Sequence, residues 1–396
     1  MTLSSGEPQL YTLKFWLLCF SSFLFFASFN MIIPELPDYL TSMGGGDHKG
    51  LIIPLFTFTA GLSRPFSGKL TDCVGRIPIM VYGVLVCIVC GVLYAVVTGV
   101  VAFFVLRLIH GMSTGFKPTA TSAYVGDIAP EHRRGEAMGI LGVFGSMGMA
   151  AGPALGSWLV MEFNYNIMFY ASSLSALLSI LVIAWMPETL ISKKKFKIDL
   201  LKIKWIDVYE PRAWRPAIVM GLSVFSFGVV LTIIPDYSKH LGIANKGLFF
   251  AVFTIASLVM RLVAGKASDK YGRERVLMLG MVLLATSMIF LGVAHTQWQL
   301  YVASIIFGLS AGINSPTVFA WTIDLANPTF RGRALATVFI SMEIGIGLGG
   351  LFSGYVYNNQ VERFPLVFIS AGILPAIALF LLLRMVNKKI KTKLNH

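Results

Sequence analysis

Charged residues are scarce in this chain. Asp, Glu, Lys and Arg make up 13% of its 396 residues, whereas hydrophobic residues make up 56%. A soluble domain usually carries about a quarter of its residues as charges, and a water-exposed surface could not be covered with so few. The composition therefore excludes an ordinary soluble protein and indicates one whose solvent is the lipid bilayer.

Cysteine is also scarce, and no cluster of metal ligands accompanies it. The four cysteines, Cys19, Cys73, Cys87 and Cys90, lie within or beside apolar runs. Cys87 and Cys90 would share one side of a helix, but no histidine or further cysteine completes a metal site. We expect neither metal nor cofactor. The sequence also shows no nucleophile–base pair and no nucleotide loop, so we do not expect an enzyme.

Long uncharged runs are what the chain has instead. Six runs are each long enough, at about 20 residues, to cross the hydrocarbon as a helix: 15–34, 137–161, 163–187, 216–235, 276–294 and 364–383. Runs 77–106 and 296–323 are longer, and the first breaks at Thr98-Gly99 into two spans. Runs 50–63 and 247–260 end at Arg64 and Arg261, whose side chains we expect to snorkel to the interface. With the stretch 334–357, the sequence predicts twelve transmembrane helices.

The net charge of +13 has a topological explanation. We place Lys49, Lys239, Lys246 and Arg363 in loops on one side, and nearly all other basic residues on the opposite side. Loops rich in Lys and Arg stay in the cytoplasm. We therefore predict an inner-membrane protein with both termini cytoplasmic, and we do not expect binding to nucleic acid.

The two halves of the sequence repeat each other at an offset of 197 residues. The matched positions include glycines and charges, for example Gly68 with Gly265, Asp72 with Asp269, Gly75 with Gly272, Arg76 with Arg273 and Asp127 with Asp324. Each half has six spans, so both enter the membrane from the same side. We predict two six-helix bundles related by a pseudo-two-fold axis, with boundaries at 1–190 and 216–396 and a cytoplasmic linker over 191–215.

One segment resembles the signature of major facilitator transporters between their second and third helices: it runs from Gly68 through Asp72 and Gly75 to Arg76. The second half repeats it at Gly265, Asp269 and Arg273. Glycine permits a tight turn and close helix approach, and Asp72 would sit at a helix N-terminus. The resemblance implies that Arg76 pairs with Asp127, and Arg273 with Asp324. These pairs would hold a cytoplasmic gate shut. Simple anchoring of the topology is the alternative role.

Two further segments are similar to the drug/proton antiporter branch of this superfamily. One contains Gly139, Gly148, Gly152, Pro153 and Gly156, where small residues allow close helix packing and proline kinks the helix. A generic close-packed helix pair is the alternative reading. The other is Arg107-x-x-His110-Gly111, whose arginine the branch associates with proton coupling. Together these segments favour export over uptake.

A basic stripe follows from helical geometry. At 100° per residue, one face of the fourth span carries Arg107, His110, Thr114, Lys117 and Thr121. Each charge costs at least about 2.5 kcal/mol at the bilayer centre, so we expect the stripe to face a central aqueous cavity and bind anions. The alternative assigns Arg107 to coupling and lets Lys117 snorkel to the cytoplasm.

Glu343 is the one carboxylate deep inside a span, and Glu35 and Asp38 cap the first span at the outer mouth. The antiporter branch usually has an acid where this chain has Asn30, which cannot titrate. Proton coupling therefore shifts to Glu343, His110 or both, beside Arg107, whose coupling role is implied by the resemblance. The alternative is that Glu343 pairs with a basic residue of the other half.

Two transport functions fit these features. One is proton-coupled efflux of an amphipathic small molecule, and the other is transport or exchange of an organic anion, with Asn30 among the cavity residues. Both use alternating access about a midplane site, and we expect a monomer. A non-transporting membrane sensor is less favoured, because the preserved motifs in both halves indicate a moving transporter.

Overall fold

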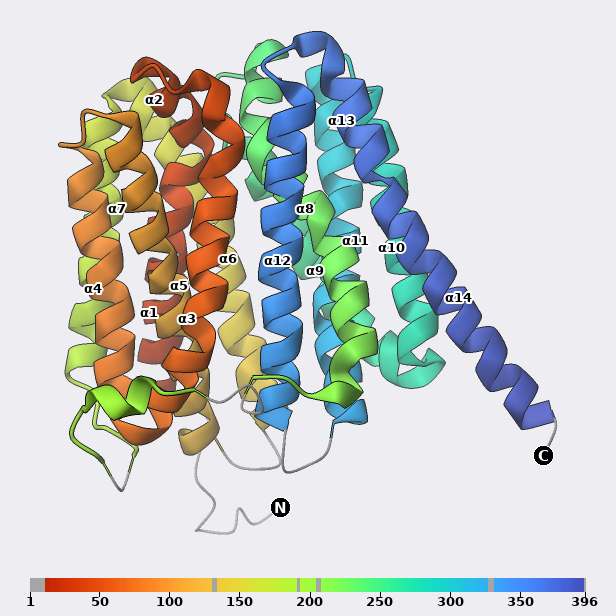
Figure 1. The fold of residues 1–396 in the computed structure, drawn as a ribbon, viewed down its shortest axis with the longest axis horizontal. Coiled ribbons are helices and arrows are strands. Elements are labelled where there is room, and N and C mark those ends of the chain that lie inside the picture. The colour runs from red at the N-terminus through yellow and green to blue at the C-terminus, as the bar shows by residue number, and fades with distance from the viewer. Residues whose placement is uncertain (1–10, 130–133, 191–192, 204–207, 327–330, 395–396) are drawn as a thin grey trace.

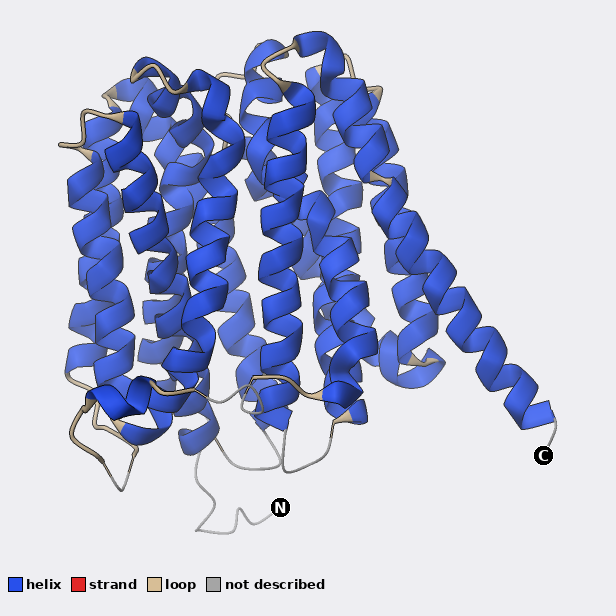
Figure 2. Ribbon diagram, viewed as in Figure 1, coloured by secondary structure: helices blue, strands red, loops and turns tan. Residues whose placement is uncertain are grey.

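The computed structural model describes residues 11–129, 134–190, 193–203, 208–326 and 331–394, and within these ranges every regular element is a helix (Figures 1 and 2). Seven α-helices form the N-terminal half: α1 (Leu13–Ile32), α2 (Leu36–Ser42), α3 (Ile52–Cys73), α4 (Arg76–Tyr94), α5 (Val100–Ile128), α6 (Arg134–Glu162) and α7 (Tyr165–Ala184). Short 3₁₀ turns, η1 (Ile33–Glu35) and η2 (Gly46–Leu51), flank α2.

The C-terminal half repeats this pattern. It consists of α8 (Trp214–His240), α9 (Leu248–Tyr271), α10 (Arg273–Gly292), α11 (Gln297–Leu325), α12 (Arg331–Tyr357), α13 (Phe364–Ala371) and α14 (Ile373–Leu394). The two halves lie side by side (Figure 1). The domain boundaries at 190 and 216 stay a prediction, and residues 191–192 and 204–207 of the expected linker lie outside the described residues.

The prediction of a twelve-span helical membrane protein is confirmed. Among the described residues, ten helices are long and apolar enough to cross a membrane, and α9 is an eleventh when counted across a bend after Arg261. The twelfth is α3, which has 22 residues but carries Arg64, Lys69 and Asp72. Because Pro34 and Pro37 cannot continue regular helical hydrogen bonding, the first span is split into α1 and α2.

Local sequence signals fix several helix starts. The side chain of Thr12 accepts a hydrogen bond from the backbone N–H of Phe15 at the start of α1. Asn164 does the same for α7, and Thr296 forms a capping box with Gln299 at the start of α11. The helices then pack around apolar clusters in each half, which hold residues such as Tyr94 and Phe103 in the N-terminal half and Phe307 in the C-terminal half.

α1 begins and α14 ends at the same end of the molecule, the lower end in Figure 1, which we call the terminal end. The opposite end is the distal end. The halves meet along two helix pairs, α3 against α12 and α6 against α9. Near the distal end these pairs approach backbone to backbone, because a Cβ atom on Gly354 would overlap Gly50, and one on Gly247 would overlap Pro153. The site described below lies along this boundary.

Candidate functional site: the boundary between the halves

Ion pairs between the halves close the distal end. Lys246, in the loop before α9, contacts two carboxylates of the N-terminal half: its Nζ lies 2.9 Å from Glu35 Oε2 and 2.8 Å from Asp38 Oδ2. Asp38 also lies 3.4 Å from Lys239 at the end of α8. We call this cluster of Glu35, Asp38, Lys239 and Lys246 the distal lock. It fastens the first span to the C-terminal half.

Ser157 of α6 completes the distal lock. Its hydroxyl donates to Glu35 Oε1 at 2.7 Å and accepts from the backbone N–H of Gly247 at 3.2 Å. Glu35 is only 2% exposed, so its two oxygens are satisfied by Ser157 and Lys246 rather than by water. Burial alone would lower the pKa of Lys246, but the charges of Glu35 and Asp38 outweigh burial and raise that pKa above 10.5. The lysine therefore stays charged at neutral pH.

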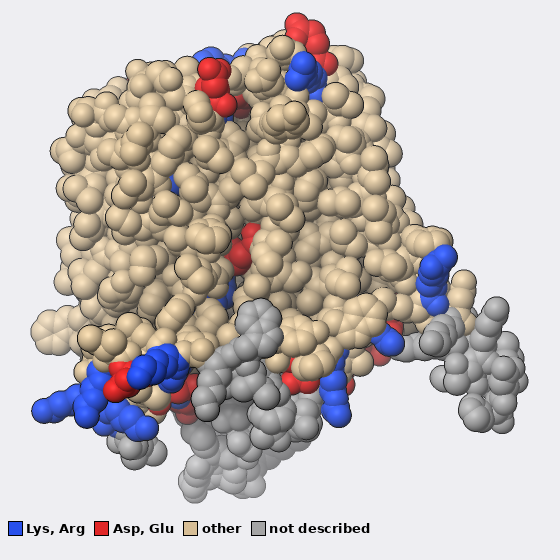
Figure 3. Space-filling view, in the orientation of Figure 1, with Lys and Arg blue, Asp and Glu red and all other residues tan. Residues whose placement is uncertain are grey.

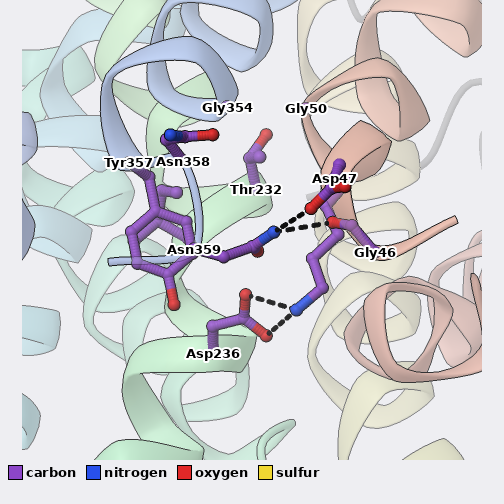
Figure 4. Close-up of a pocket in the computed structure, with 11 residues that line it drawn as sticks. Gly46, Asp47, Gly50, Thr232, Asp236, Gly354, Tyr357, Asn358 and Asn359 are labelled. Carbon is purple, nitrogen blue, oxygen red and sulfur yellow. Dashed lines mark hydrogen bonds and ion pairs between the residues drawn. The ribbon is translucent and has the colours of Figure 1, made fainter. Parts of the chain in front are cut away.

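A second contact at the distal end joins η2 to α8 and to the turn after α12 (Figure 4). The Lys49 amine donates to both carboxylate oxygens of Asp236, at 3.1 and 2.9 Å. Beside it, the Asn359 amide donates to the carbonyl of Gly46 at 3.1 Å and to Asp47 Oδ1 at 3.2 Å. These residues line a small pocket between the halves. The distal end is therefore closed in this structure.

The charged pairs at the terminal end join helices within one half. Arg76 Nε lies 3.0 Å from Asp127 Oδ2, and Arg273 Nε lies 2.9 Å from Asp324 Oδ2. The first pair links α4 to α5, and the second links α10 to α11, which are the third and fourth spans of each half. The pairs therefore exist where resemblance placed them, but they do not bridge the halves, and they are formed while the distal end is closed. The gating role assigned to them stays a prediction.

The surroundings of these motifs differ from expectation in two ways. Asp72 pairs with Arg76 at 3.2 Å and is 71% exposed in its side chain, whereas the carboxylate at the N-terminus of α4 belongs to Glu188. Glu188 accepts from the backbone N–H groups of Arg76 and Ile77 at 3.0 and 3.1 Å. This contact of Glu188 was not predicted, although its position just after an apolar span was a signal. Asp269 repeats the Asp72 contact by pairing with Arg273.

The motif glycines divide by role. Gly75 has φ of +141° and Gly272 has φ of +92°, which only glycine adopts readily, so both make the tight turn that was expected. A Cβ atom at Gly68 or Gly265 would meet nothing within 4 Å. The expectation of close helix approach at those two positions is therefore wrong for this conformation.

Glu343 lies at the boundary between the halves, midway along α12. Its Oε1 accepts from Arg64 Nη2 of α3 at 2.8 Å, and the Arg64 guanidinium lies over the ring of Phe339. The side chains of Arg64 and Glu343 are 12% and 9% exposed. In Figure 3, charged atoms of both signs appear at mid-height, between an upper and a lower rim where most of the other charged side chains lie. We expected Arg64 to snorkel to the interface, and that expectation is wrong. A carboxylate of the other half holds its side chain inside the protein.

The basic stripe of α5 points into the N-terminal half. Arg107, His110 and Lys117 are 1%, 0% and 0% exposed, and Thr114 is 8% exposed. Arg107 donates to the Ile52 carbonyl at 3.0 Å, which keeps it among residues of its own half. The expectation that the stripe faces an open aqueous cavity is therefore wrong for this conformation, because neighbouring helices of the same half cover these side chains.

The individual contacts of the stripe are polar but uncharged. Lys117 Nζ donates to the Ser22 hydroxyl at 3.0 Å, and His110 Nε2 lies 3.3 Å from the Cys87 sulfur. His110 Nδ1 is buried without a hydrogen-bond partner. Asn30, on α1, donates to the Phe26 carbonyl one turn earlier at 2.8 Å. The structure thus brings Arg64 to Glu343, and it places the stripe residues elsewhere.

The small residues of α6 let it lie close to α1. A Cβ atom at Gly148, Gly152 or Gly156 would overlap the backbone of α1, at Phe23, Ala27 and Met31 respectively. Pro153 lies within α6, and its carbonyl abuts Gly247 of the other half. At Gly139, however, a Cβ atom would meet nothing within 4 Å. The packing role expected of Gly139 is therefore wrong.

The model of the family described as Major Facilitator Superfamily matches residues 18–244 and 216–395. The chain belongs to the Major Facilitator Superfamily. This assignment agrees with the internal repeat and the twelve spans, and it identifies the protein as a multi-pass secondary transporter rather than an enzyme. The resemblance read from Gly68 to Arg76 is therefore confirmed.

Relatives of this superfamily member include proteins named for multidrug resistance and efflux. It is 25% identical over 368 residues to the multidrug resistance protein MdtG of Enterobacter lignolyticus, covering 88% of this chain and 86% of the relative. It is 27% identical over 347 residues to the multi-drug resistance efflux pump PmrA of Streptococcus pneumoniae, covering 84% and 85%.

Solved structures share the fold of this superfamily member at low sequence identity. The human organic anion transporter MFSD10 superposes with a TM-score of 0.72 at 19% identity, covering 93% of this chain and 98% of that one. A peptide transporter in complex with sulfate superposes with a TM-score of 0.78 at 18% identity, covering 97% and 96%. These likenesses concern the fold alone.

Proposed function

We propose that this transporter exports an amphipathic organic molecule across the inner membrane in exchange for protons, with the terminal end and both termini in the cytoplasm. The names of the relatives, multidrug resistance protein and efflux pump, support export of small molecules. The close packing of α6 on α1 at Gly148, Gly152 and Gly156 supports the same branch. A single chain supplies both halves, so it works as a monomer.

The observation that carries the coupling proposal is the pair between Arg64 and Glu343. It is the one described ion pair between the halves that lies at mid-membrane depth, far from either end of α12. A proton that neutralises Glu343 removes the attraction to Arg64, and this loosens α3 from α12. Protonation thereby changes the balance between conformations in which the halves are rocked together and apart.

The distal lock and the pair between Lys49 and Asp236 define the other end of the cycle. In the conformation described, the distal end is closed by contacts from Lys246 to Glu35 and Asp38. Opening that end separates these charges, and reclosing restores them. Protons enter from the distal side when it is open, and the transported molecule enters from the terminal side when the distal lock is closed. Export in exchange for protons follows from this alternation.

Transport in proteoliposomes tests the proposal. Purified protein is reconstituted and an acid interior is imposed. Uptake of two amphipathic aromatic dyes, the cation ethidium and the anion anilinonaphthalenesulfonate, is then followed by fluorescence. Accumulation that needs the pH gradient and disappears when a protonophore is added is the expected result. Accumulation driven equally well without the gradient refutes proton coupling, and no protein-dependent uptake of any amphipathic probe refutes export.

A further inference from the structure

The internal repeat makes the two interfaces between the halves directly comparable. On one of them, Arg64 of α3 pairs with Glu343 of α12. The offset of 197 residues matches these positions to Arg261 of α9 and Ser146 of α6. One interface therefore has an arginine and a carboxylate, and the other has an arginine and a serine at the equivalent places.

The contacts at the distal end show that the two interfaces are built alike. Gly50 abuts Gly354 where α3 approaches α12, and the repeat matches these residues to Gly247 and Ser157. Gly247 indeed donates its backbone N–H to the Ser157 hydroxyl at 3.2 Å. Arg64 and Arg261 follow their glycines by the same number of residues along α3 and α9. The repeat therefore places Arg261 beside α6 at the level of Ser146.

Arg261 lacks the counter-charge that Arg64 has. Both arginines have a buried Nε without a hydrogen-bond partner, but Arg64 is neutralised through its Nη2 by Glu343. No carboxylate of the described residues lies within ion-pair distance of Arg261. Its repeat partner Ser146 is 7% exposed and carries no charge. A cation inside a membrane protein without a counter-ion is costly, and such residues are retained for function.

We propose that Arg261 binds the anionic group of the transported molecule, a carboxylate or a sulfonate attached to an apolar body. This assignment rests on the proposed function and names the substrate class of that transporter. The bound anion supplies to Arg261 the counter-charge that Glu343 supplies to Arg64, so both interfaces become neutral when the substrate is in place. The guanidinium of Arg107 in the N-terminal half contacts a carbonyl rather than a carboxylate, and its charge adds a positive field that favours an anion.

Two naphthalene probes of opposite charge test the proposal. Equilibrium dialysis against detergent-purified protein compares naphthalenesulfonate with naphthyltrimethylammonium, which share the apolar ring. The natural protein is expected to bind the sulfonate more tightly. The variant Ser146→Glu supplies the carboxylate missing from this interface, and it should weaken sulfonate binding by about tenfold or more, because it takes the charge-assisted contact of Arg261. The variant Arg261→Ala should lose the preference as well.

Ser146→Gln is the matched control, because it adds nearly the same volume without a charge. It should weaken sulfonate binding much less than Ser146→Glu does, and thermal unfolding of each variant confirms that it is folded. Equal binding of both probes by the natural protein overturns the proposal, as does a Ser146→Glu variant that binds the sulfonate normally. Displacement of the sulfonate by phosphatidylglycerol at equal concentration overturns it too, because the site would then belong to a lipid headgroup.

The result can be separated from a failure of the proposed function. A protein that accumulates either dye under a pH gradient but shows no preference for the sulfonate retains its export function and lacks the anion site. A protein that binds the sulfonate through Arg261 but accumulates no probe retains the anion site and lacks proton-coupled export.

Discussion

Removal of the lysine at the centre of the distal lock should open the distal end. The variant Lys246→Ala leaves Glu35, which is 2% exposed, with Ser157 alone, and leaves Asp38 with the weak contact to Lys239. Removing one partner of a buried ion pair costs about 3–5 kcal/mol. Since the Asp38 side chain is 20% exposed and regains some water, we take about 3 kcal/mol, the lower limit. This corresponds to about a hundredfold shift toward the distally open conformation.

Distance measurement between spin labels reads this shift directly. Thr98, in the turn before α5, and Glu362, before α13, are exposed positions at the distal end of the two halves and suit cysteine labelling. Cys73, the one native cysteine that is not fully buried, is replaced by serine in this background. In Lys246→Ala, the distance between the two labels should show an additional, longer population that is absent from the natural protein.

Lys239→Ala is the control for this prediction, because Lys239 meets the same Asp38 carboxylate but is 66% exposed in its side chain. An exposed pair contributes about 0–1 kcal/mol, so the distance distribution should stay nearly unchanged. An unaltered distribution in Lys246→Ala, or an equal opening in Lys239→Ala, refutes the reasoning that burial gives the distal lock its strength.

Three further predictions concern the lock, the helix packing and the turn before α4. Because the pKa of Lys246 lies above 10.5, titration of this lysine should not open the distal end between about pH 7 and about pH 10, and a spin-label distance that lengthens within this range contradicts the assignment. Gly156→Ala should destabilise the protein by about 1–3 kcal/mol, because the added Cβ overlaps the Met31 backbone. Gly139→Ala should be neutral or mildly stabilising, because a Cβ there meets nothing. Equal thermal unfolding temperatures of the two variants would count against the packing of α6 on α1. Glu188→Ala should lower the free energy of unfolding by about 1 kcal/mol, since two N–H groups at the start of α4 lose their acceptor. Asp199→Ala removes only an exposed pair with Lys202, so its thermal unfolding should change little.

The sequence predicted the fold because its evidence is local or repeated. Span lengths follow from uncharged runs, and the register between Gly68 and Gly265 fixes two equivalent halves. Helix turns at Gly75 and Gly272 were predictable for the same reason, since their positive φ values require glycine. These features depend on neighbouring residues in the chain and on the bilayer, and both are visible in a sequence.

The site was harder to predict because it depends on which helices meet. Nothing near Arg64 in sequence reveals Glu343, which lies on α12 of the other half, so snorkelling was a reasonable but wrong expectation. A contact of Glu343 with a basic residue of the other half was weighed as an alternative to proton coupling. The structure shows that contact, and the coupling role of Glu343 stays a prediction. The stripe of Arg107 and Lys117 was correctly placed on one helix face, but periodicity does not reveal that the face packs inside its own half.

The distal lock was missed although its parts were noted. Glu35 and Asp38 were placed at the outer mouth, and Lys239 and Lys246 in loops on the same side. Opposite charges at one end of the two halves were the available signal. What the sequence does not give is the distance between them, which depends on the rocking angle of the halves and is set by contacts such as that of Ser157 with Gly247.

We propose that Glu343 carries the coupled proton, and measuring transport by the variant Glu343→Gln tests this role. Glutamine keeps the size and a hydrogen-bond acceptor for Arg64 but cannot exchange a proton. In proteoliposomes, this variant should lose pH-driven accumulation of whichever dye the natural protein accumulates, while it keeps exchange of that dye across the membrane without a gradient. Glu343→Asp should retain part of the accumulation. Accumulation by Glu343→Gln that matches the natural protein would show that the proton is carried elsewhere.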